Sequence, residues 1–106
     1  MLYDTIKNKI KEKMMQKDQA ALMTYRNILS AFTNELVANG RKPTEMLSDE
    51  EALVVIKRLA KKGGKAVELF KQGNRQDLVD KEEAEIEILK SYLPKNDEDK
   101  KEINHS

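Results

Sequence analysis

Basic side chains gather on one predicted helical segment and are the residues of this chain best suited to binding a charged ligand. Lys57, Lys61 and Lys65 recur every four residues, which places them in one row on a helix. A helical rise of about 1.5 Å per residue makes that row about 12 Å long. The candidate nucleic-acid-binding residues are Lys57, Arg58, Lys61, Lys62, Lys65 and Arg75. Such a row can follow a nucleic-acid backbone, and the alternative is a solvated face balanced by nearby acids.

Charge is distributed unevenly along the chain, although the formal net charge is only +1. Residues 57–75 contain seven basic side chains and one acidic side chain, which gives this segment +6. Residues 76–90 contain six acidic side chains and two lysines, which gives −4. Two neighbouring helices with these charges either neutralise each other in part or present opposite faces to different partners.

The chain offers few residues for catalysis on its own. It has no cysteine, and its one histidine is His105 near the C-terminus, so neither a Ser–His–acid triad nor a Cys–His pair can be assembled. The Gly-Gly-Lys segment 63–65 invites comparison with a phosphate-binding loop, but that pattern requires glycine where the chain has Leu59 and a hydroxyl residue where it has Ala66. We therefore expect no catalytic residue, no metal site and no cofactor. The acidic run 82–87 is expected to be an exposed helix face.

Size and composition describe one small domain. With 106 residues, of which 39% are hydrophobic and 37% charged, the core must be thin and built from one apolar stripe per helix. No apolar run approaches the roughly 20 residues of a membrane span. The N-terminus lacks a basic head followed by an apolar block, so we expect no signal peptide. The absence of cysteine fits a reducing compartment, and the expected location is cytoplasmic, with no membrane partner.

Two helices are expected before the first glycine. The first runs from Leu2 to about Gln16, and the second runs from an N-cap at Asp18 to about Asn39, where Gly40 takes a left-handed conformation and ends it. Apolar residues at helical spacing give each helix a buried face. These are Leu2, Tyr3, Ile6, Ile10 and Met14 in the first helix, and Leu22, Tyr25, Ile28, Leu29, Phe32, Leu36 and Val37 in the second. Because its apolar face is broader, the second helix is expected to be central.

The third helix is expected to begin with a capping box formed by Ser48 and Glu51 and to end at about Gln72. The apolar spacing continues through Gly63 and Gly64, which predicts one unbroken helix although glycine disfavours helix by about 1 kcal/mol relative to alanine. Gly63 would let a neighbouring backbone approach closely. The expected buried residues are Leu53, Ile56, Ala60, Gly63, Val67 and Phe70.

The fourth helix is expected to begin near Arg75, after Gly73 has ended the third helix, with Asn74 as its N-cap. It runs to Tyr92 and is closed by Pro94, which disfavours helical geometry in the residue before it. Its buried side is formed by Val79, Ile86, Leu89 and Leu93.

The predicted fold class is therefore all-α. A small four-helix domain occupies residues 1–94, its third and fourth helices form a long antiparallel hairpin, and the first two helices pack against that hairpin. Residues 95–106 are mostly charged or polar and are expected to form a disordered tail.

Several segments together resemble one known family. They are Met15–Asp18, Tyr25–Phe32, Leu47–Leu53, Glu68–Glu85 (ELFKQGNRQDLVDKEEAE) and Ile88–Pro94 (ILKSYLP). Residues 2 to about 94 are similar to the GatB/YqeY family, small bacterial proteins similar to the C-terminal appendage of the B subunit of tRNA-dependent amidotransferases. The chain departs from the family pattern at Gly63-Gly64, where arginine is usual, and at Ala66, where serine is frequent.

The resemblance implies an all-helical subdomain with a long hairpin and a link to transamidation of mischarged tRNA. In that reaction, a carbon–nitrogen ligation with glutamine as amido donor, the appendage contacts tRNA while other domains do the chemistry. The family normally continues after Leu-Pro into a three-helix subdomain, which we expect to be absent because the chain ends at Ser106.

The expected function is a tRNA-binding accessory module that is not catalytic alone. The alternative is a helical protein-interaction or oligomerisation module that binds a protein partner or itself. An open row at Lys57, Lys61 and Lys65 favours the first function. An exposed apolar strip at Leu59, Leu69 and Tyr92 favours the second.

Overall fold

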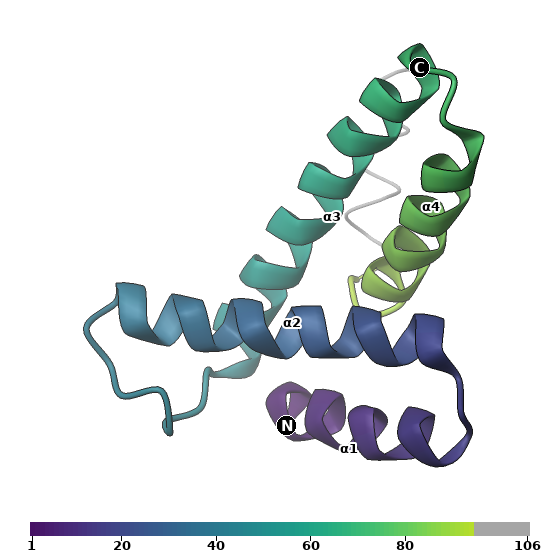
Figure 1. Cartoon of the computed structure of the whole chain (residues 1–106). Helices are drawn as coiled ribbons and strands as arrows, with labels where there is room; N and C mark the ends of the chain where they lie inside the picture. The colour runs from purple at the N-terminus through teal and green to yellow at the C-terminus, as the bar shows by residue number, and fades with distance from the viewer. Residues whose placement is uncertain (95–106) are drawn as a thin grey trace.

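The computed structural model describes residues 1–94, which form four helices joined by turns and one longer loop (Figure 1). The helices are α1 (Leu2–Met15), α2 (Gln19–Ala38), α3 (Asp49–Gln72) and α4 (Gln76–Lys90). The predicted all-α, four-helix fold is confirmed. The predicted tail and His105 lie outside the described residues.

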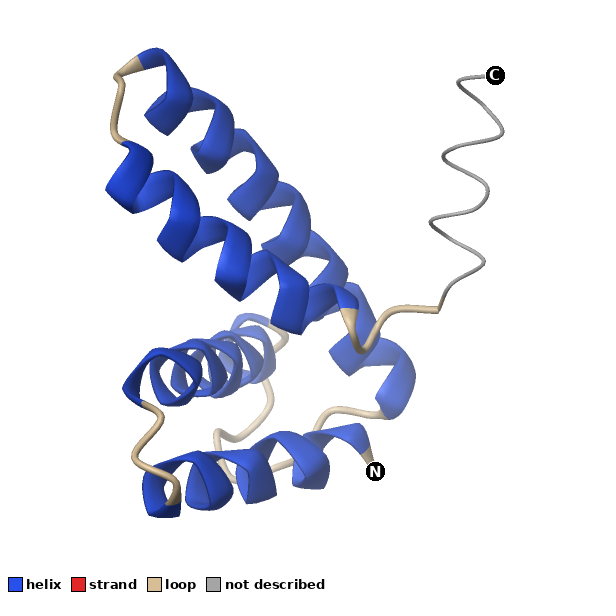
Figure 2. Ribbon diagram, turned by 90° about the vertical axis from the view of Figure 1, so that its right-hand side faces the viewer, coloured by secondary structure: helices blue, strands red, loops and turns tan. Residues whose placement is uncertain are grey.

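The four helices pair as two hairpins. α1 lies along α2, and α3 lies along α4, with the α3–α4 pair rising away from the α1–α2 pair (Figures 1 and 2). α2 contacts all three other helices, as expected for a central helix, and α3 does so as well. The predicted antiparallel hairpin of the third and fourth helices is likewise present.

The core lies where α1, α2 and the N-terminal half of α3 meet. The ring of Tyr3 in α1 stacks on that of Phe32 in α2, with centroids 5.5 Å apart. α4 reaches this core at its C-terminal end, where the hydroxyl groups of Tyr25 and Tyr92 share a 2.8 Å hydrogen bond. Partial burial, followed by that hydrogen bond, raises the pKa of Tyr92. The buried core residues are Tyr3, Ile6, Ala21, Tyr25, Ile28, Phe32, Leu36, Leu47, Ala52, Val55, Ile56, Ala60 and Leu89.

Two residues predicted to be buried are exposed. Met14 has 52% of its surface exposed because it lies in the last turn of α1, beyond the part of that helix that contacts the core. Val37 is 55% exposed. Its neighbour Leu36 takes the core-facing position, and the turn of about 100° per residue directs Val37 outward.

The helix ends follow the expected chemistry with one exception. Asp18 accepts a 3.2 Å hydrogen bond from the backbone N–H of Ala21, as an N-cap does. Gly40 adopts the predicted left-handed conformation, with φ of 73°. After α3, however, Asn74 takes that left-handed role with φ of 56°, and the N-cap of α4 is Arg75. The prediction of Asn74 as N-cap is wrong because asparagine also tolerates the left-handed region, which the turn requires here.

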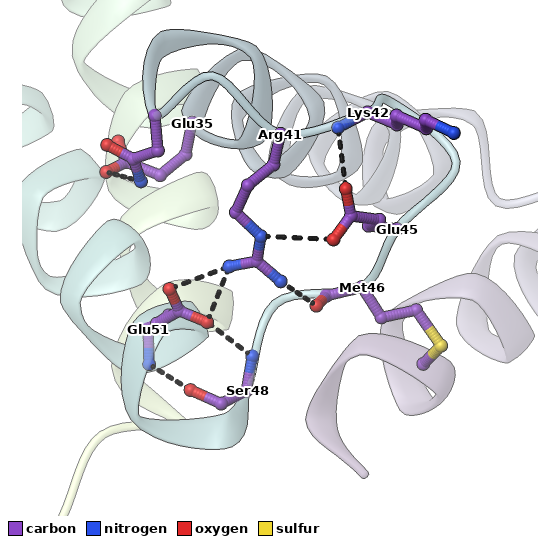
Figure 3. Close-up of polar contacts among 8 residues, drawn as sticks. Glu35, Arg41, Lys42, Glu45, Met46, Ser48 and Glu51 are labelled. Carbon is purple, nitrogen blue, oxygen red and sulfur yellow. Dashed lines mark hydrogen bonds and ion pairs between the residues drawn. The ribbon is translucent and has the colours of Figure 1, made fainter.

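Arg41 organises the loop between α2 and α3 (Figure 3). Its Nη1 donates to both carboxylate oxygens of Glu51, at 3.1 and 2.9 Å, and its Nη2 donates to the carbonyl of Met46 at 2.8 Å. Glu51 also accepts from the Ser48 backbone N–H at 2.9 Å, and Ser48 Oγ accepts from the Glu51 N–H, which confirms the predicted capping box. The Ser48 N–H and then Arg41 lower the pKa of Glu51. The first turn of α3 is therefore fixed in direction.

α3 is continuous through both glycines, as predicted. A Cβ atom at Gly63 would lie 2.9 Å from Cγ1 of Ile86 and 3.0 Å from Oε1 of Glu82, whereas a Cβ at Gly64 would meet nothing within 4 Å. Gly63 therefore does permit close packing of α4. The atoms that approach it belong to side chains, whereas the sequence predicted a neighbouring backbone.

The core divides the molecule into two regions. We define the base as α1, α2, the loop after α2, residues 49–60 of α3 and residues 88–93 at the end of α4. We define the arm as residues 61–87, the distal part of the α3–α4 hairpin (Figure 2). Within the described residues, all members of the core cluster lie in the base, while the arm buries Gly63, Val67 and Val79 in its own seam.

Candidate functional site

The six predicted nucleic-acid-binding residues are all exposed and lie along the hairpin. Lys57 and Arg58 belong to the base. Lys61, Lys62 and Lys65 belong to the arm, and Arg75 lies at its tip, between α3 and α4. Because α3 is unbroken, Lys57, Lys61 and Lys65 form the expected row on one helix.

The two arginines are engaged in ion pairs. Arg58 donates from Nη1 to Oε1 of Glu35 at 3.0 Å, which links α3 to α2. Arg75 donates from Nε and Nη2 to the carboxylate of Asp77, at 3.3 Å each, and this contact lowers the pKa of Asp77. Both arginines therefore have a structural contact that competes with a ligand.

The arm lysines differ from the arginines. In the part of the chain that the structure describes, no ion pair involves Lys61, Lys62 or Lys65. Their ammonium groups lie on the exposed side of a rigid helix. Of the six candidates, these three have the charge most accessible to a polyanion.

Lys57, Lys61 and Lys65 also border an open groove that runs between α3 and α4. The opposite wall carries Glu83 and Glu87 of α4. The groove measures about 1060 Å³. That volume lies at the upper end of the range of small-molecule pockets, about 300–1,000 Å³, and the groove is open along its length.

The floor and rim of the groove are partly apolar. Val67 and Ile86 contribute from the seam, and Leu69 on α3 is 65% exposed. Leu59 and Tyr92, the other two residues of the expected apolar strip, are half-buried against the core. The structure thus has both an open basic row and a shorter apolar strip at the groove.

The sequence did not reveal the groove or its acidic wall, since residues 82–87 were interpreted only as an exposed face. A signal was present: Glu83 and Glu87 are four residues apart, the same spacing as Lys61 and Lys65. Only the packing of α3 on α4 shows that these two rows lie on the same side of the hairpin.

Glu85 lies outside the groove and is half-buried. Burial, and then the nearby charge of Glu82, raises the pKa of its carboxyl group. Among residues 1–94, no cluster of three or more histidine, cysteine, aspartate or glutamate side chains is placed to hold a metal ion. In the same range, no helix combines the length and the apolar character needed to cross a bilayer.

The sequence pattern of the YqeY-like protein family matches residues 3–105, almost the whole chain. The chain belongs to the YqeY-like protein family. This confirms the resemblance found in the motifs, and the match extends beyond the described residues.

Curated relatives come from fungi. "Altered inheritance of mitochondria protein 41, mitochondrial" of Lachancea thermotolerans is 37% identical over 90 residues, which cover 83% of this chain and 46% of that protein. The protein of the same name from Saccharomyces cerevisiae is 32% identical over 89 residues, with the same coverage of 83% and 46%. An uncharacterised protein of Schizosaccharomyces pombe is 28% identical over 87 residues, covering 82% and 71%. This YqeY-like chain spans about half the length of the two named relatives.

The expectation of a cytoplasmic location is contradicted by the relatives from Lachancea thermotolerans and Saccharomyces cerevisiae, which are named as mitochondrial proteins. That expectation rested on the absence of cysteine and on the composition of the first residues, and neither feature distinguishes one compartment from another. The expected bacterial origin stays a prediction, because the relatives described above are fungal.

Proposed function

We propose that this YqeY-like protein is an RNA-binding accessory module with tRNA as its partner, and that it does not catalyse amide transfer by itself. The observation that carries the proposal is the exposed arm cluster of Lys61, Lys62 and Lys65, which have no ion pair within residues 1–94. The resemblance to the amidotransferase appendage supports tRNA as the RNA concerned.

The arrangement of the lysines suits contacts with the phosphate backbone of RNA rather than with its bases. Three ammonium groups on a continuous helix can each approach a phosphate as independent point charges. Such contacts release counterions, so log affinity should fall with log salt by about 0.7 to 0.9 units for each phosphate neutralised. A module of this kind would hold RNA in place while catalytic groups are supplied by other domains or proteins.

The test is charge reversal of the cluster in the full chain. The variant Lys61→Glu/Lys62→Glu/Lys65→Glu should fold normally, since exposed substitutions usually change stability by about 0.5 kcal/mol or less each. Its tRNA affinity at low salt should be at least about tenfold lower than that of wild type. The slope of log affinity against log salt should be steeper for wild type than for the variant by roughly two to three units. Binding is measured by titration with tRNA at two salt concentrations.

The matched control reverses three exposed lysines outside the arm, Lys11→Glu/Lys17→Glu/Lys42→Glu, which changes the net charge equally. If this control loses as much affinity as the cluster variant, binding depends only on net charge. If wild-type protein does not bind tRNA, or if both variants bind as it does, the proposal is wrong.

A second candidate function is a protein-docking module, and the groove is the observation that favours it. Its walls carry opposite charges, Lys61 and Lys65 on one side and Glu83 and Glu87 on the other, while exposed Leu69 adds apolar surface. A phosphate backbone would be repelled by the glutamate wall. A helical protein surface that carries both acidic and basic side chains would not be repelled, because each wall could face the opposite charge.

A further inference from the structure

The groove on the arm has a definite order of charge. On the α3 wall, Lys61 and Lys65 are followed by Glu68 and Lys71, and on the α4 wall Glu83 and Glu87 are followed by Lys90. The central part of the groove therefore has lysines on one wall and glutamates on the other, with a mostly apolar floor between them. All the residues that line the groove belong to α3 and α4 or are Leu93, so neither α1 nor α2 obstructs its opening. An occupant must therefore bring an apolar ridge with acidic side chains on one flank and basic side chains on the other.

The packing of Gly63 fixes which residues lie opposite each other across the groove. Gly63 is in contact with Ile86 and Glu82, and the two helices run antiparallel. Consequently Lys65 lies level with Glu83, and Lys61 lies level with Glu87. Within residues 1–94, no ion pair joins these four side chains across the groove.

A second copy of this hairpin satisfies that requirement. If two copies face each other across a two-fold axis parallel to the helices, α3 of each copy lies over α4 of the other. Heights along the axis are unchanged by this rotation, so Lys65 meets Glu83 of the second copy and Lys61 meets Glu87. A two-fold axis perpendicular to the helices would instead place the lysine row of one copy against the lysine row of the other. Only the first arrangement is charge-complementary.

We propose that two copies of this chain pair face to face through the α3–α4 groove of the arm, forming a four-helix bundle. The proposal rests on the docking role of the groove and names its partner. Two groove faces supply eight ion-pairing side chains, which form four ion pairs at the two matched levels, and Leu69 of each copy adds apolar surface. At the base end of the groove, Lys57 and Lys90 lie near one level, so two lysines would face each other there. Pairing is therefore expected to be tightest toward the arm.

The first test exchanges the charges of the walls in the full chain. One variant, Lys61→Glu/Lys65→Glu, has two acidic walls, and the other, Glu83→Lys/Glu87→Lys, has two basic walls. Sedimentation equilibrium distinguishes the 12.2 kDa monomer from a dimer over about a thousandfold range of concentration. Each variant alone should dimerise at least about tenfold more weakly than wild type, because like charges face each other. An equimolar mixture of the two should regain dimers, since acidic walls then meet basic walls.

The second test blocks the groove without relying on charge. Gly64→Trp places a large side chain on the groove face, where a Cβ meets nothing within 4 Å, so the monomer should fold as before. Val54→Trp is the matched control, because Val54 is 58% exposed on the same helix and outside the groove. The first variant should be monomeric where the control still dimerises.

Several outcomes would overturn the proposal. Wild-type chain that stays monomeric throughout would leave the groove to another protein or to residues after Pro94. Dimers that survive both Gly64→Trp and the charge variants would use another surface.

Pairing through the groove engages Lys61 and Lys65, so it competes with tRNA for these two side chains. The variant with all four wall substitutions restores complementary walls but lacks Lys61 and Lys65. It should dimerise like wild type and bind tRNA more weakly than wild type at protein concentrations where both are monomeric. Normal dimers with unchanged tRNA affinity would contradict the tRNA proposal alone.

Discussion

The base and the arm are built from the same two helices yet are stabilised differently. In the base, α3 and α4 pack on α1 and α2, and side chains such as Phe32 and Ile56 are fully buried. In the arm, the same helices have only each other, and Val67 and Val79 are the buried side chains of a single seam. A two-helix layer cannot cover its second face, so most of the groove lies on the arm, and Lys57, Ala60, Lys90 and Leu93 extend it onto the base.

This difference separates the residues that stabilise the fold from those of the candidate site. The base contains the capping box, the Arg41 contacts and the core, all of which fix the direction of the hairpin. The arm contributes little to the core, and it carries the unpaired lysines and the acidic wall. Substitutions in the two regions should therefore have different consequences. Two comparisons between base and arm test this, and a third, inside the arm, tests how tightly its seam is packed.

The largest difference is expected between Phe32→Ala in the base and Val79→Ala in the arm. Phe32→Ala should lower the free energy of unfolding by about 3–5 kcal/mol, because it leaves a cavity in the core. Val79→Ala should cost about 1.5–2 kcal/mol at most, from the loss of two methyl groups. Urea unfolding gives both values, and hydrogen exchange should show that Val79→Ala opens only the arm. Equal loss of protection in the base would show that base and arm unfold as one unit.

The two glycines of the arm give the next comparison. At Gly63, the Cβ of alanine would lie 2.9 Å from Cγ1 of Ile86, so the Ile86 side chain or α4 must shift. Overpacking of this kind costs about 1–3 kcal/mol, only partly offset by better helix propensity. At Gly64, alanine meets nothing and should stabilise the helix by about 1 kcal/mol. Thermal unfolding of both variants measures the difference. If Gly63→Ala is as stable as Gly64→Ala, the arm seam is looser than the contact implies.

The smallest effects are expected from two glutamates whose pKa shifts have opposite signs. In the base, Glu51 has a lowered pKa, so its stabilising contribution is present above its ordinary value of 4.5 and is lost as pH falls through the folded value. In the arm, Glu85 has a raised pKa, so stability is favoured below 4.5 and is lost as pH rises through the folded value.

Glutamine variants separate these two effects. At neutral pH, Glu51→Gln should be less stable than wild type and Glu85→Gln more stable, because the first loses a favourable charge and the second removes an unfavourable one. Both differences should shrink toward acidic pH. Urea unfolding between about pH 3 and 7 measures them, and differences that do not change with pH would contradict the assignment.

Local chemistry predicted most of the helix boundaries. Asp18, Gly40 and the Ser48–Glu51 capping box each act through neighbouring backbone groups, so their roles can be derived from a few residues. The apolar spacing through Gly63 and Gly64 likewise predicted an unbroken α3. Asn74 was misassigned because asparagine suits both an N-cap and a left-handed turn, and nothing local distinguishes these roles.

The candidate site was predicted only in part. Lys57, Lys61 and Lys65 were expected to form an exposed row, and they do. The contacts of Arg58 with Glu35 and of Arg75 with Asp77 were not anticipated. The exposure of Met14 and Val37 was not anticipated either. Helical spacing identifies the apolar side of a helix, but it does not show how far a neighbouring helix extends along that side.

The sequence by itself determined the fold class, the four helices, the caps at Asp18, Gly40 and Ser48, and the basic row, because each depends on residues within about one or two helical turns of each other. Tertiary structure alone decided that Lys61 and Lys65 share a groove with Glu83 and Glu87. That arrangement depends on the rotation of α3 relative to α4, which is set where Gly63, lacking a Cβ, accepts Ile86 and Glu82. Rotation about a helix axis is a long-range packing property, and no spacing within one helix encodes it.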